Sequence, residues 1–321
     1  MAESLRVLAV RREATDIVSV DFAVDEGTPV KATPGAHLRL ALGDRLVRQY
    51  TLCNGPDDGP FYRVAVKREP ASRGGSAAIH SLRPGDRVVS EGPFNQFEVD
   101  WSHRHLVLVA AGIGITPILS MALHAAARGH EFEVHYFCQS EDHAAFRARL
   151  EQAAGSRLSM HIGLDPDSVS ERLRSVLTGR PQGSGLYVCG PTRFMDLARD
   201  IGGRSDGIVA VHFESFGSDE SASSQADRER DCEVPFRVRL ARSRVEYEVP
   251  ADRSILEVLE SEGVDVLCSC RGGVCGMCVT EVLEGEPDHR DEFLSEASKA
   301  EGQLMTICVS RSKRPMLVLD L

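Results

Sequence analysis

The 321-residue sequence contains no run of about 18 apolar residues, the length that a helix needs to cross a bilayer. Its first segment, MAESLRVLAVRREATD, also lacks the apolar core of a signal peptide, because Glu3, Arg6 and Arg11 interrupt it. From these two absences we expect a protein that is located in the cytoplasm and does not associate with a membrane.

The sequence also has fewer basic than acidic side chains. The chain has 37 Lys and Arg against 48 Asp and Glu, which gives a formal net charge of −11 at pH 7. A surface that binds nucleic acid needs an excess of basic side chains against the phosphates. We therefore exclude nucleic acid and expect a protein or a small molecule as the partner. We also expect the chain to act as a monomer.

The length exceeds that of one typical domain, and no internal repeat is apparent. Residues 1–100 contain short alternating runs that are separated by Gly, Pro and Asp clusters such as NGPDDGP. This pattern predicts an antiparallel β-barrel or sandwich. The runs that show the alternation most clearly are Ile17 to Val24, His37 to Leu42 and Tyr62 to Val66.

Residues 101–216 have a different pattern. The apolar run HLVLVA leads through AGIGIT into the helical segment PILSMALHAAARG, with Pro117 suited to a first turn and Gly129 to a C-terminal stop. Further buried strands are predicted, with helices between them, so this part is expected to be a parallel α/β domain. These strands are Phe132 to Phe137, Leu186 to Cys189 and Ile208 to Phe213.

The segment GSDESASSQADRERD has no large apolar residue, so we predict a linker over 217–233. Beyond it, FRVRLARSRVEYEVP indicates two strands about a turn at Arg242 and Ser243. The segment SILEVLESEG indicates a helix that Gly263 ends. We expect residues 234–321 to form a small α+β domain.

The segment CSCRGGVCGMC, residues 268–278, contains four of the nine cysteines. In a reducing compartment an odd total of nine cysteines, four of them clustered in this segment, indicates metal or cofactor ligation and not disulfides. The spacing C-x4-C-x2-C, with one more cysteine downstream, is that of plant-type [2Fe-2S] ferredoxins. The predicted ligands are Cys270, Cys275, Cys278 and Cys308.

Two alternatives to this ligand set are open. A structural zinc site is one, although it would leave the C-x4-C spacing unexplained. Cys268 is the surplus cysteine and competes as a ligand, but a small loop cysteine is the preferred interpretation because Cys270 fits the spacing. The glycines of the loop, Gly272, Gly273 and Gly276, would let backbone N–H groups approach the sulfurs.

A barrel, a nucleotide domain and a ferredoxin domain in this order resemble the phthalate dioxygenase reductase family of the ferredoxin-NAD(P) reductase superfamily. The resemblance covers essentially the whole chain. It implies a multidomain fold with a flavin barrel, an α/β nicotinamide domain and a β-grasp ferredoxin domain. The motifs that carry it are RQYTLCN (48–54), VKREPASRGGS (66–76), AGIGITPILSMA (111–122), CGP (189–191), HFESFG (212–217), the cysteine loop, DHRDEFLS and ICVSR.

RQYTL resembles the flavin signature R-x-Y-[ST]-L of this superfamily. The resemblance places Arg48 at the flavin phosphate, Tyr50 on the ring system and Thr51 beside the nitrogen N5. Alone the motif is weak, because an Arg and a Tyr on one strand usually serve the structure. The companion segment SRGGS can turn backbone amides and a hydroxyl onto a phosphate. The other implied flavin contacts are Gln49, Lys67, Arg73, Gly74, Gly75 and Ser76. Spacing does not distinguish FMN from FAD, and the resemblance favours FMN.

AGIGITP lacks the third glycine of G-x-G-x-x-G, so on its own it equally fits a plain strand-to-helix turn. The resemblance implies that Gly112 and Gly114 let the dinucleotide approach the backbone and that Thr116 lies near both cofactors.

The motifs CGP and HFESF are the remaining pieces of the implied active site. Cys189, with Gly190 and Pro191, would lie where the nicotinamide stacks on the flavin, and Glu214 and Phe216 would lie over the flavin. The alternatives are an inert buried cysteine and an ordinary core phenylalanine. The residues that the resemblance places in catalytic contact are Thr51, Cys189 and Phe216.

Acidic residues follow the second strand of the nicotinamide domain. A carboxylate at that strand end favours ribose hydroxyls and disfavours a 2′-phosphate. Glu141 and Asp142 therefore suggest NADH, and the alternative is that they are solvated loop charges.

These features predict an NADH-dependent oxidoreductase that passes electrons from NADH to FMN, then to the [2Fe-2S] cluster and to a protein acceptor. The resemblance implies that the acceptor is the terminal oxygenase of a Rieske-type aromatic dioxygenase or demethylase. One alternative is another acceptor, such as a cytochrome-type monooxygenase. The other is a redox sensor or interaction module that binds zinc.

Overall fold

The computed structural model describes residues 3–25, 27, 29–43, 46–70, 74–214, 234–268, 273, 276–291 and 293–321. The chain forms two compact units, Met1–Phe216 and Gly217–Leu321. No helix within the described residues is long and apolar enough to cross a membrane.

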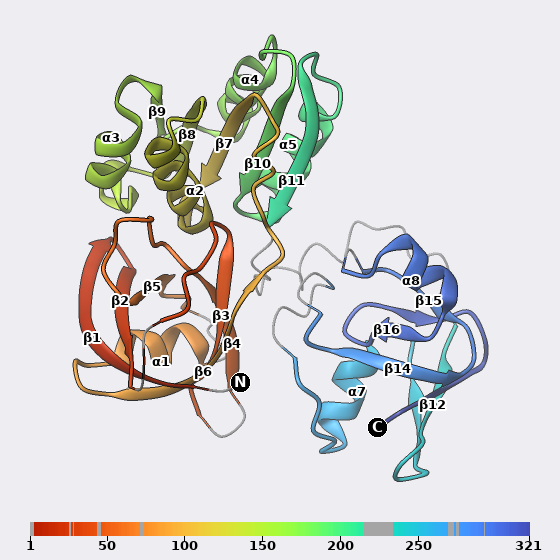
Figure 1. The fold of residues 1–321 in the computed structure, drawn as a ribbon. Helices are drawn as coiled ribbons and strands as arrows, with labels where there is room; N and C mark the ends of the chain where they lie inside the picture. Colours follow the sequence, from red (N-terminus) through yellow and green to blue (C-terminus); the bar gives the residue numbers. More distant parts are fainter. Residues whose placement is uncertain are drawn as a thin grey trace. The chain divides into compact units, whose positions relative to one another are not determined.

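The first unit begins with a curled six-stranded antiparallel sheet in the order β4-β3-β6-β1-β2-β5 (Figure 1). A bridge between Leu52 and Val64 brings the two edges of this sheet together. Alternation along the strands buries one face, which includes Val20, Phe22 and Leu38. The elements are β1 (Glu3–Ala14), β2 (Ile17–Val24), β3 (Ala36–Ala41), β4 (Val47–Thr51), β5 (Tyr62–Lys67), α1 (Gly75–Ser81) and β6 (Arg87–Asn95).

The rest of this unit is a five-stranded parallel sheet in the order β11-β10-β7-β8-β9, which lies above the barrel in Figure 1. The strands are β7 (His105–Ala111), β8 (Phe132–Cys138), β9 (Leu158–Ile162), β10 (Ser184–Cys189) and β11 (Ile208–Glu214). The helices are α2 (Ile115–Arg128), α3 (Arg147–Ala154), α4 (Pro166–Leu177) and α5 (Thr192–Gly202), with the short turns η1 (Gly112–Gly114), η2 (Glu141–His143) and η3 (Gly155–Arg157).

Helices cover both faces of the parallel sheet. Leu106 and Leu108 pack with residues of α2 and α3, whereas Val107 and Val109 pack with residues of α4 and α5. The chain leaves β7 toward β8 and later returns to β7's other side with β10. Between β7 and β10 the strand order reverses, and ligands of open α/β sheets bind at the carboxyl ends of the strands at such a point.

The second unit has a mixed five-stranded sheet in the order β13-β12-β18-β14-β16, with α7 packed on it. Ser254 begins α7 with a capping box that Glu257 completes. The elements are β12 (Phe236–Leu240), β13 (Glu246–Val249), α7 (Ile255–Ser261), β14 (Val279–Glu284), β15 (Pro287–Asp288), α8 (Glu296–Glu301), β16 (Leu304–Thr306), β17 (Arg311–Ser312) and β18 (Met316–Leu319). The predicted multidomain fold class is confirmed by this architecture.

Candidate active site

The two flavin motifs meet at one place in the barrel. A Cβ added at Gly75 would lie 2.8 Å from Cγ of Arg48 and 3.1 Å from the hydroxyl of Tyr50. Only a glycine allows the start of α1 to pack this closely against both side chains. Burial raises the pKa of Tyr50, so the tyrosine stays neutral. Arg48 and Tyr50 therefore face the backbone of the GGS segment, as a phosphate site at α1 requires.

The other predicted flavin contacts lie around this point or on the opposite side. Gly74 directly precedes α1, and the Ser76 hydroxyl accepts a hydrogen bond from the Glu69 N–H at 3.1 Å. Lys67 pairs at 3.6 Å with Glu69 at the exposed end of β5. Gln49 alternates with Arg48 and Tyr50, so its side chain lies on the other face of β4. Arg73 lies outside the described residues.

Thr51 and Glu214 form the contact between the barrel and the parallel sheet at the site. The Thr51 hydroxyl donates a 3.1 Å hydrogen bond to Oε2 of Glu214. Burial raises the pKa of Glu214 to about 8, and the hydrogen bond from Thr51 offsets part of that effect. Glu214 therefore holds a proton at neutral pH.

Cys189 lies opposite Glu214 in the register of β10 and β11. It is fully buried, and burial, with a smaller contribution from Glu214, raises the pKa of its thiol well above the ordinary value. The thiol is therefore a neutral side chain and not a thiolate nucleophile.

The two glycine turns touch each other at the point where the strand order reverses. A Cβ added at Gly114 would overlap the carbonyl group of Cys189, so the AGIGITP turn packs directly on the CGP turn. Gly190 in turn lies against Ala111, where a Cβ would approach to 2.9 Å. Thr116 is buried in the first turn of α2, and its hydroxyl donates to the Ile113 carbonyl at 3.2 Å.

Gly112 and Pro191 are the other predicted residues of the AGIGITP and CGP turns. Gly112 opens η1, and Pro191 is the residue from which α5 begins. Phe216 lies outside the described residues, so its predicted place over the flavin stays a prediction. The described residues that four separate segments bring together are Thr51, Gly114, Cys189 and Glu214.

Glu141 and Asp142 lie in η2, directly beyond β8, but their side chains are not equivalent. Glu141 forms an ion pair with Arg147, and Arg147 also donates to Glu151 at 2.8 Å. Asp142 is held through its backbone, whose carbonyl accepts from the Thr15 N–H at 2.7 Å. Sequence reasoning missed Arg147. Its only signal was an Arg-Glu pair four residues apart on a helix.

Two of the four predicted cluster ligands are described, and they lie close together. Cys278 and Cys308 are both buried, and the N–H of Ile307 donates to the carbonyl of Cys278 at 3.3 Å. Pairing of β14 with β16 produces this proximity, since Val279 is opposite Thr306. Cys270 and Cys275 lie outside the described residues. Within those that are described, no three His, Cys, Asp or Glu residues are arranged to hold a metal ion.

The loop residues that are described fit a compact cluster. Gly276 has a φ of +68°, and a Cβ there would overlap the ring of Phe293. Gly276 thus packs tightly on the ring of Phe293. The thiol of Cys268 donates at 3.5 Å to Oε1 of Glu260, and its side chain packs on the core of the domain.

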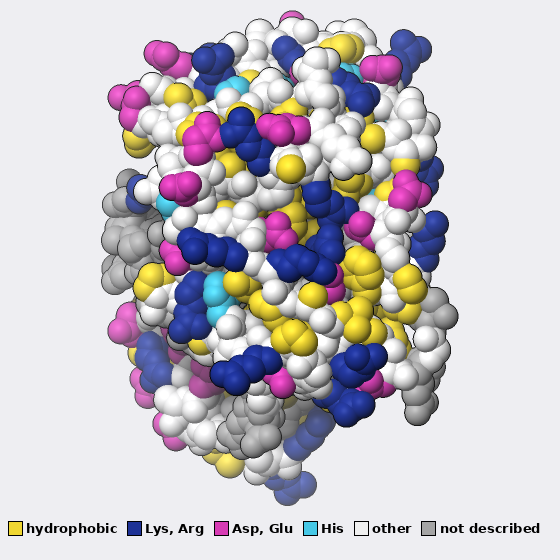
Figure 2. Space-filling view, turned by 90° about the vertical axis from the view of Figure 1, so that its left-hand side faces the viewer, with side chains coloured by type: hydrophobic (Ala, Val, Ile, Leu, Met, Phe, Trp, Pro, Cys, Tyr) yellow, Lys and Arg dark blue, Asp and Glu magenta, His cyan; other side chains and the backbone are white. Residues whose placement is uncertain are grey.

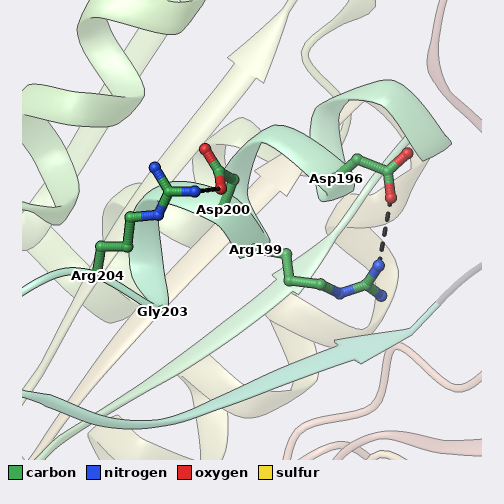
Figure 3. Close-up of a pocket in the computed structure, with 5 residues that line it drawn as sticks. All are labelled: Asp196, Arg199, Asp200, Gly203 and Arg204. Carbon is green, nitrogen blue, oxygen red and sulfur yellow. Dashed lines mark hydrogen bonds and ion pairs between the residues drawn. The ribbon is translucent and has the colours of Figure 1, made fainter.

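A hollow of about 490 Å³ lies elsewhere, on the outer end of α5 (Figure 3). Its side chains are engaged with one another, Arg204 with Asp200 at 2.7 Å and Arg199 with Asp196 at 3.3 Å. Figure 2 shows basic, acidic and apolar side chains intermingled on the face that it presents. We assign no role to this hollow.

Two family models match the chain. Residues 238–313 match the 2Fe-2S iron-sulfur cluster binding domain. Residues 87–206 match the N-terminal domain of proteins like DmmA, a dimethylamine monooxygenase subunit. Vanillate O-demethylase oxidoreductase of Pseudomonas sp. (strain HR199 / DSM 7063) is 39% identical over 98% of this chain and 98% of its own length.

Among solved structures, phthalate dioxygenase reductase, described as a modular structure for electron transfer from pyridine nucleotides to [2Fe-2S], has a TM-score of 0.72. It is 36% identical and covers 100% of this chain and 98% of its own. The chain belongs to the phthalate dioxygenase reductase family. It is an oxidoreductase with a C-terminal [2Fe-2S] domain. An intact type IV self-sufficient cytochrome P450 monooxygenase has a TM-score of 0.77 and is 32% identical over 100% of this chain, which spans 41% of that protein.

Proposed function

We propose that the chain is the NADH-dependent reductase component of an oxygenase system. It would pass electrons from NADH through FMN and the [2Fe-2S] cluster to the terminal oxygenase of a Rieske-type aromatic dioxygenase or demethylase. One observation carries the proposal: Thr51, Gly114, Cys189 and Glu214 meet where the strand order reverses, in a chain that also has a [2Fe-2S] domain. We propose residues 1–100, 101–216 and 234–321 as its three domains.

The barrel residues fit FMN. Arg48 and Tyr50 lie against Gly75, so a charged donor fork, an aromatic face and backbone amides are available within one small region. Bound there, FMN would supply the ability to accept two electrons together and release them one at a time. Lys67, Gly74 and Ser76 lie in the adjoining segment and would complete the phosphate contacts.

The chain's own residues would control charge at the reacting atoms. Glu214 keeps its proton at neutral pH, so it places no negative charge beside a flavin that gains electrons. Thr51 fixes the orientation of that carboxyl group. The contact of Gly114 with the Cys189 carbonyl holds the two glycine turns together, and Gly112, where an added Cβ would meet nothing within 4 Å, would leave the backbone open to a nicotinamide. Phe216, two residues beyond Glu214, would cover the flavin.

NADH is the proposed donor, and Glu141 and Asp142 would disfavour the 2′-phosphate of NADPH. The ion pair of Glu141 with Arg147 weakens that discrimination, because Arg147 offsets part of the negative charge. We therefore propose that NADH is preferred over NADPH, and that the ion pair of Glu141 with Arg147 sets the size of this preference.

Cys270, Cys275, Cys278 and Cys308 are the proposed cluster ligands. Two of them are buried side by side at the end of β14, and Gly276 keeps the loop small beside them. Four thiolates are the ligand set that a plant-type cluster requires. Cys268 would not be a ligand, since its thiol is already engaged with Glu260.

A cytochrome-type acceptor is the second candidate. It is favoured by the self-sufficient cytochrome P450 in which a segment similar to the whole of this chain occurs. In either case we propose that the protein is a monomer that docks transiently on its acceptor. We also propose a cytoplasmic location, since NADH is available in that compartment.

An absorption spectrum and a cofactor analysis of the purified protein test the core of the proposal. We expect one FMN, one [2Fe-2S] cluster and NADH-dependent bleaching of both. Zinc in place of iron, or a protein without flavin, would contradict the proposal. Reduction of a purified Rieske-type terminal oxygenase, compared with reduction of a bacterial cytochrome P450, separates the two acceptors.

A further inference from the structure

The loop of residues 54–58 follows β4 closely, with Asn54 three residues beyond Thr51. The barrel holds this loop firmly. Nδ2 of Asn54 donates to the Phe61 carbonyl at 2.9 Å, and Oδ1 accepts from the Arg63 N–H at 2.7 Å. The loop and the end of β4 therefore move as one body with the barrel.

Helix α2 holds the same loop from the nucleotide-binding side. The buried Ser120 hydroxyl donates to the carbonyl of Asn54 at 2.7 Å. A Cβ added at Gly55 would lie 3.0 Å from Cβ of Leu123, so the loop backbone lies directly on the helix. Helix α2 begins one residue after Gly114, and it therefore links the loop to the glycine turn of the site.

Helix α3 adds a charged contact. One terminal nitrogen of Arg149 donates to both oxygens of Asp58, at 2.9 and 2.8 Å, and Asp58 also accepts from the Gly55 N–H at 2.8 Å. The two side chains are only 26% and 19% exposed, and the other terminal nitrogen of Arg149 is buried without a partner. Loss of Asp58 would leave a largely buried cation unpaired, which is costly.

We propose that these four residues, Asn54, Asp58, Ser120 and Arg149, form a joint that sets the distance between the flavin on the barrel and the nicotinamide on the α/β domain. The inference rests on the proposed function, namely transfer of hydride from NADH to FMN. The residues of the joint are positioning residues, because they act on the reaction through Thr51 at one end and Gly114 at the other. Hydride transfer depends steeply on the separation of donor and acceptor.

The test uses the full-length protein loaded with FMN and cluster. NADH at saturating concentration is mixed rapidly under anaerobic conditions, and the rate of flavin bleaching is recorded. We expect Arg149→Met and Asp58→Asn each to slow bleaching by about tenfold, within the hundredfold loss that a displacement of about 1 Å can cause. The Kd for NADH and the FMN content should not change. Arg149→Lys should restore part of the rate, because it keeps the charge.

Two readouts besides the rate separate positioning from damage. The long-wavelength absorption of stacked nicotinamide and flavin should weaken in Arg149→Met. In FMN-free Arg149→Met, amide hydrogen exchange at residues 54–58 should be faster than in the FMN-free wild type, while exchange in β7 and β10 should be unchanged. Ser120→Ala removes only one oxygen and should slow flavin bleaching by less than the charge variants do. It keeps the joint testable if the charge variants fold poorly. The control is Arg204→Met, which removes an exposed ion pair with Asp200 at the end of α5, the helix that packs on the opposite face of the parallel sheet from α2 and α3.

The outcomes distinguish the joint from the proposed function. If NADH does not bleach the flavin of the wild-type protein, the proposed function fails. If the wild type is bleached and Arg149→Met, Asp58→Asn and Ser120→Ala react at the same rate as Arg204→Met, the joint is wrong. The joint is equally wrong if the slow variants regain the wild-type rate when excess FMN is added, because the loss would then be one of flavin binding.

Discussion

The hydroxyl of Thr51 donates to the carboxyl group of Glu214 over 3.1 Å, although the two residues are 163 positions apart in the chain. Thr51 ends the barrel strand β4, and Glu214 ends the outermost strand of the parallel sheet. A single hydrogen bond thus joins the residue expected at flavin N5 to a buried acid. Burial keeps the proton on that acid and makes it sensitive to pH near neutrality.

Glu214→Gln should remove a pH dependence of stability. The pKa of Glu214 is raised from 4.5 to about 8, so between those values the folded state holds a proton that the unfolded state releases. The free energy of unfolding of the FMN-free wild type should therefore fall as pH rises through this window, by up to about 1.4 kcal/mol per pH unit. Urea unfolding of both proteins from pH 5 to 9 measures this effect. Parallel curves would show that Glu214 titrates normally.

Cys308→Ser should abolish or strongly destabilise the [2Fe-2S] cluster, because it removes one of four thiolates from a buried position. Flavin content and bleaching of the flavin by NADH should persist, since they belong to the other unit. Cys275→Ser should behave in the same way. Cys268→Ser is the matched control and should keep its iron. Iron analysis and visible circular dichroism measure the cluster content of each variant. A Cys308→Ser protein with full iron content would refute the ligand set.

Glu141→Gln should narrow the preference for NADH over NADPH. The change removes a carboxylate that repels a 2′-phosphate and also frees Arg147 to attract one. The ratio of kcat/KM for the two nucleotides should fall by about three- to tenfold, as a change of roughly 1 kcal/mol would give. Asp142→Asn is expected to have a smaller effect in the same direction. An unchanged ratio in both variants would mean that these side chains are only loop charges.

Much of the fold was predictable because its signals are local. The alternation of IVSVDFAV predicted Ile17 to Val24, and β2 has these bounds. The Gly129 stop is also found at the end of α2. The family resemblance predicted which segments would form the site, and the structure brings RQYTL beside GGS and AGIGITP beside CGP.

What the sequence did not predict depends on contacts between distant segments. The partnership of Asp58 with Arg149 spans 91 residues, and no local period specifies it. The raised pKa of Glu214 arises from burial that only the folded sheet creates. The pairing of Glu141 with Arg147 depends on how η2 leads into α3, which changes the charge that a bare motif would suggest.

The central claim is that the [2Fe-2S] cluster is the exit for the electrons. It is tested most directly by comparing the full chain with a protein that ends at Phe216, the last residue of the first unit. The shorter protein should bind FMN and oxidise NADH with a small dye at a rate similar to that of the full chain. It should reduce the partner oxygenase at least about a hundredfold more slowly, because every proposed cluster ligand is absent. Equal rates of oxygenase reduction by the two proteins would show that the flavin itself is the exit and would contradict the account.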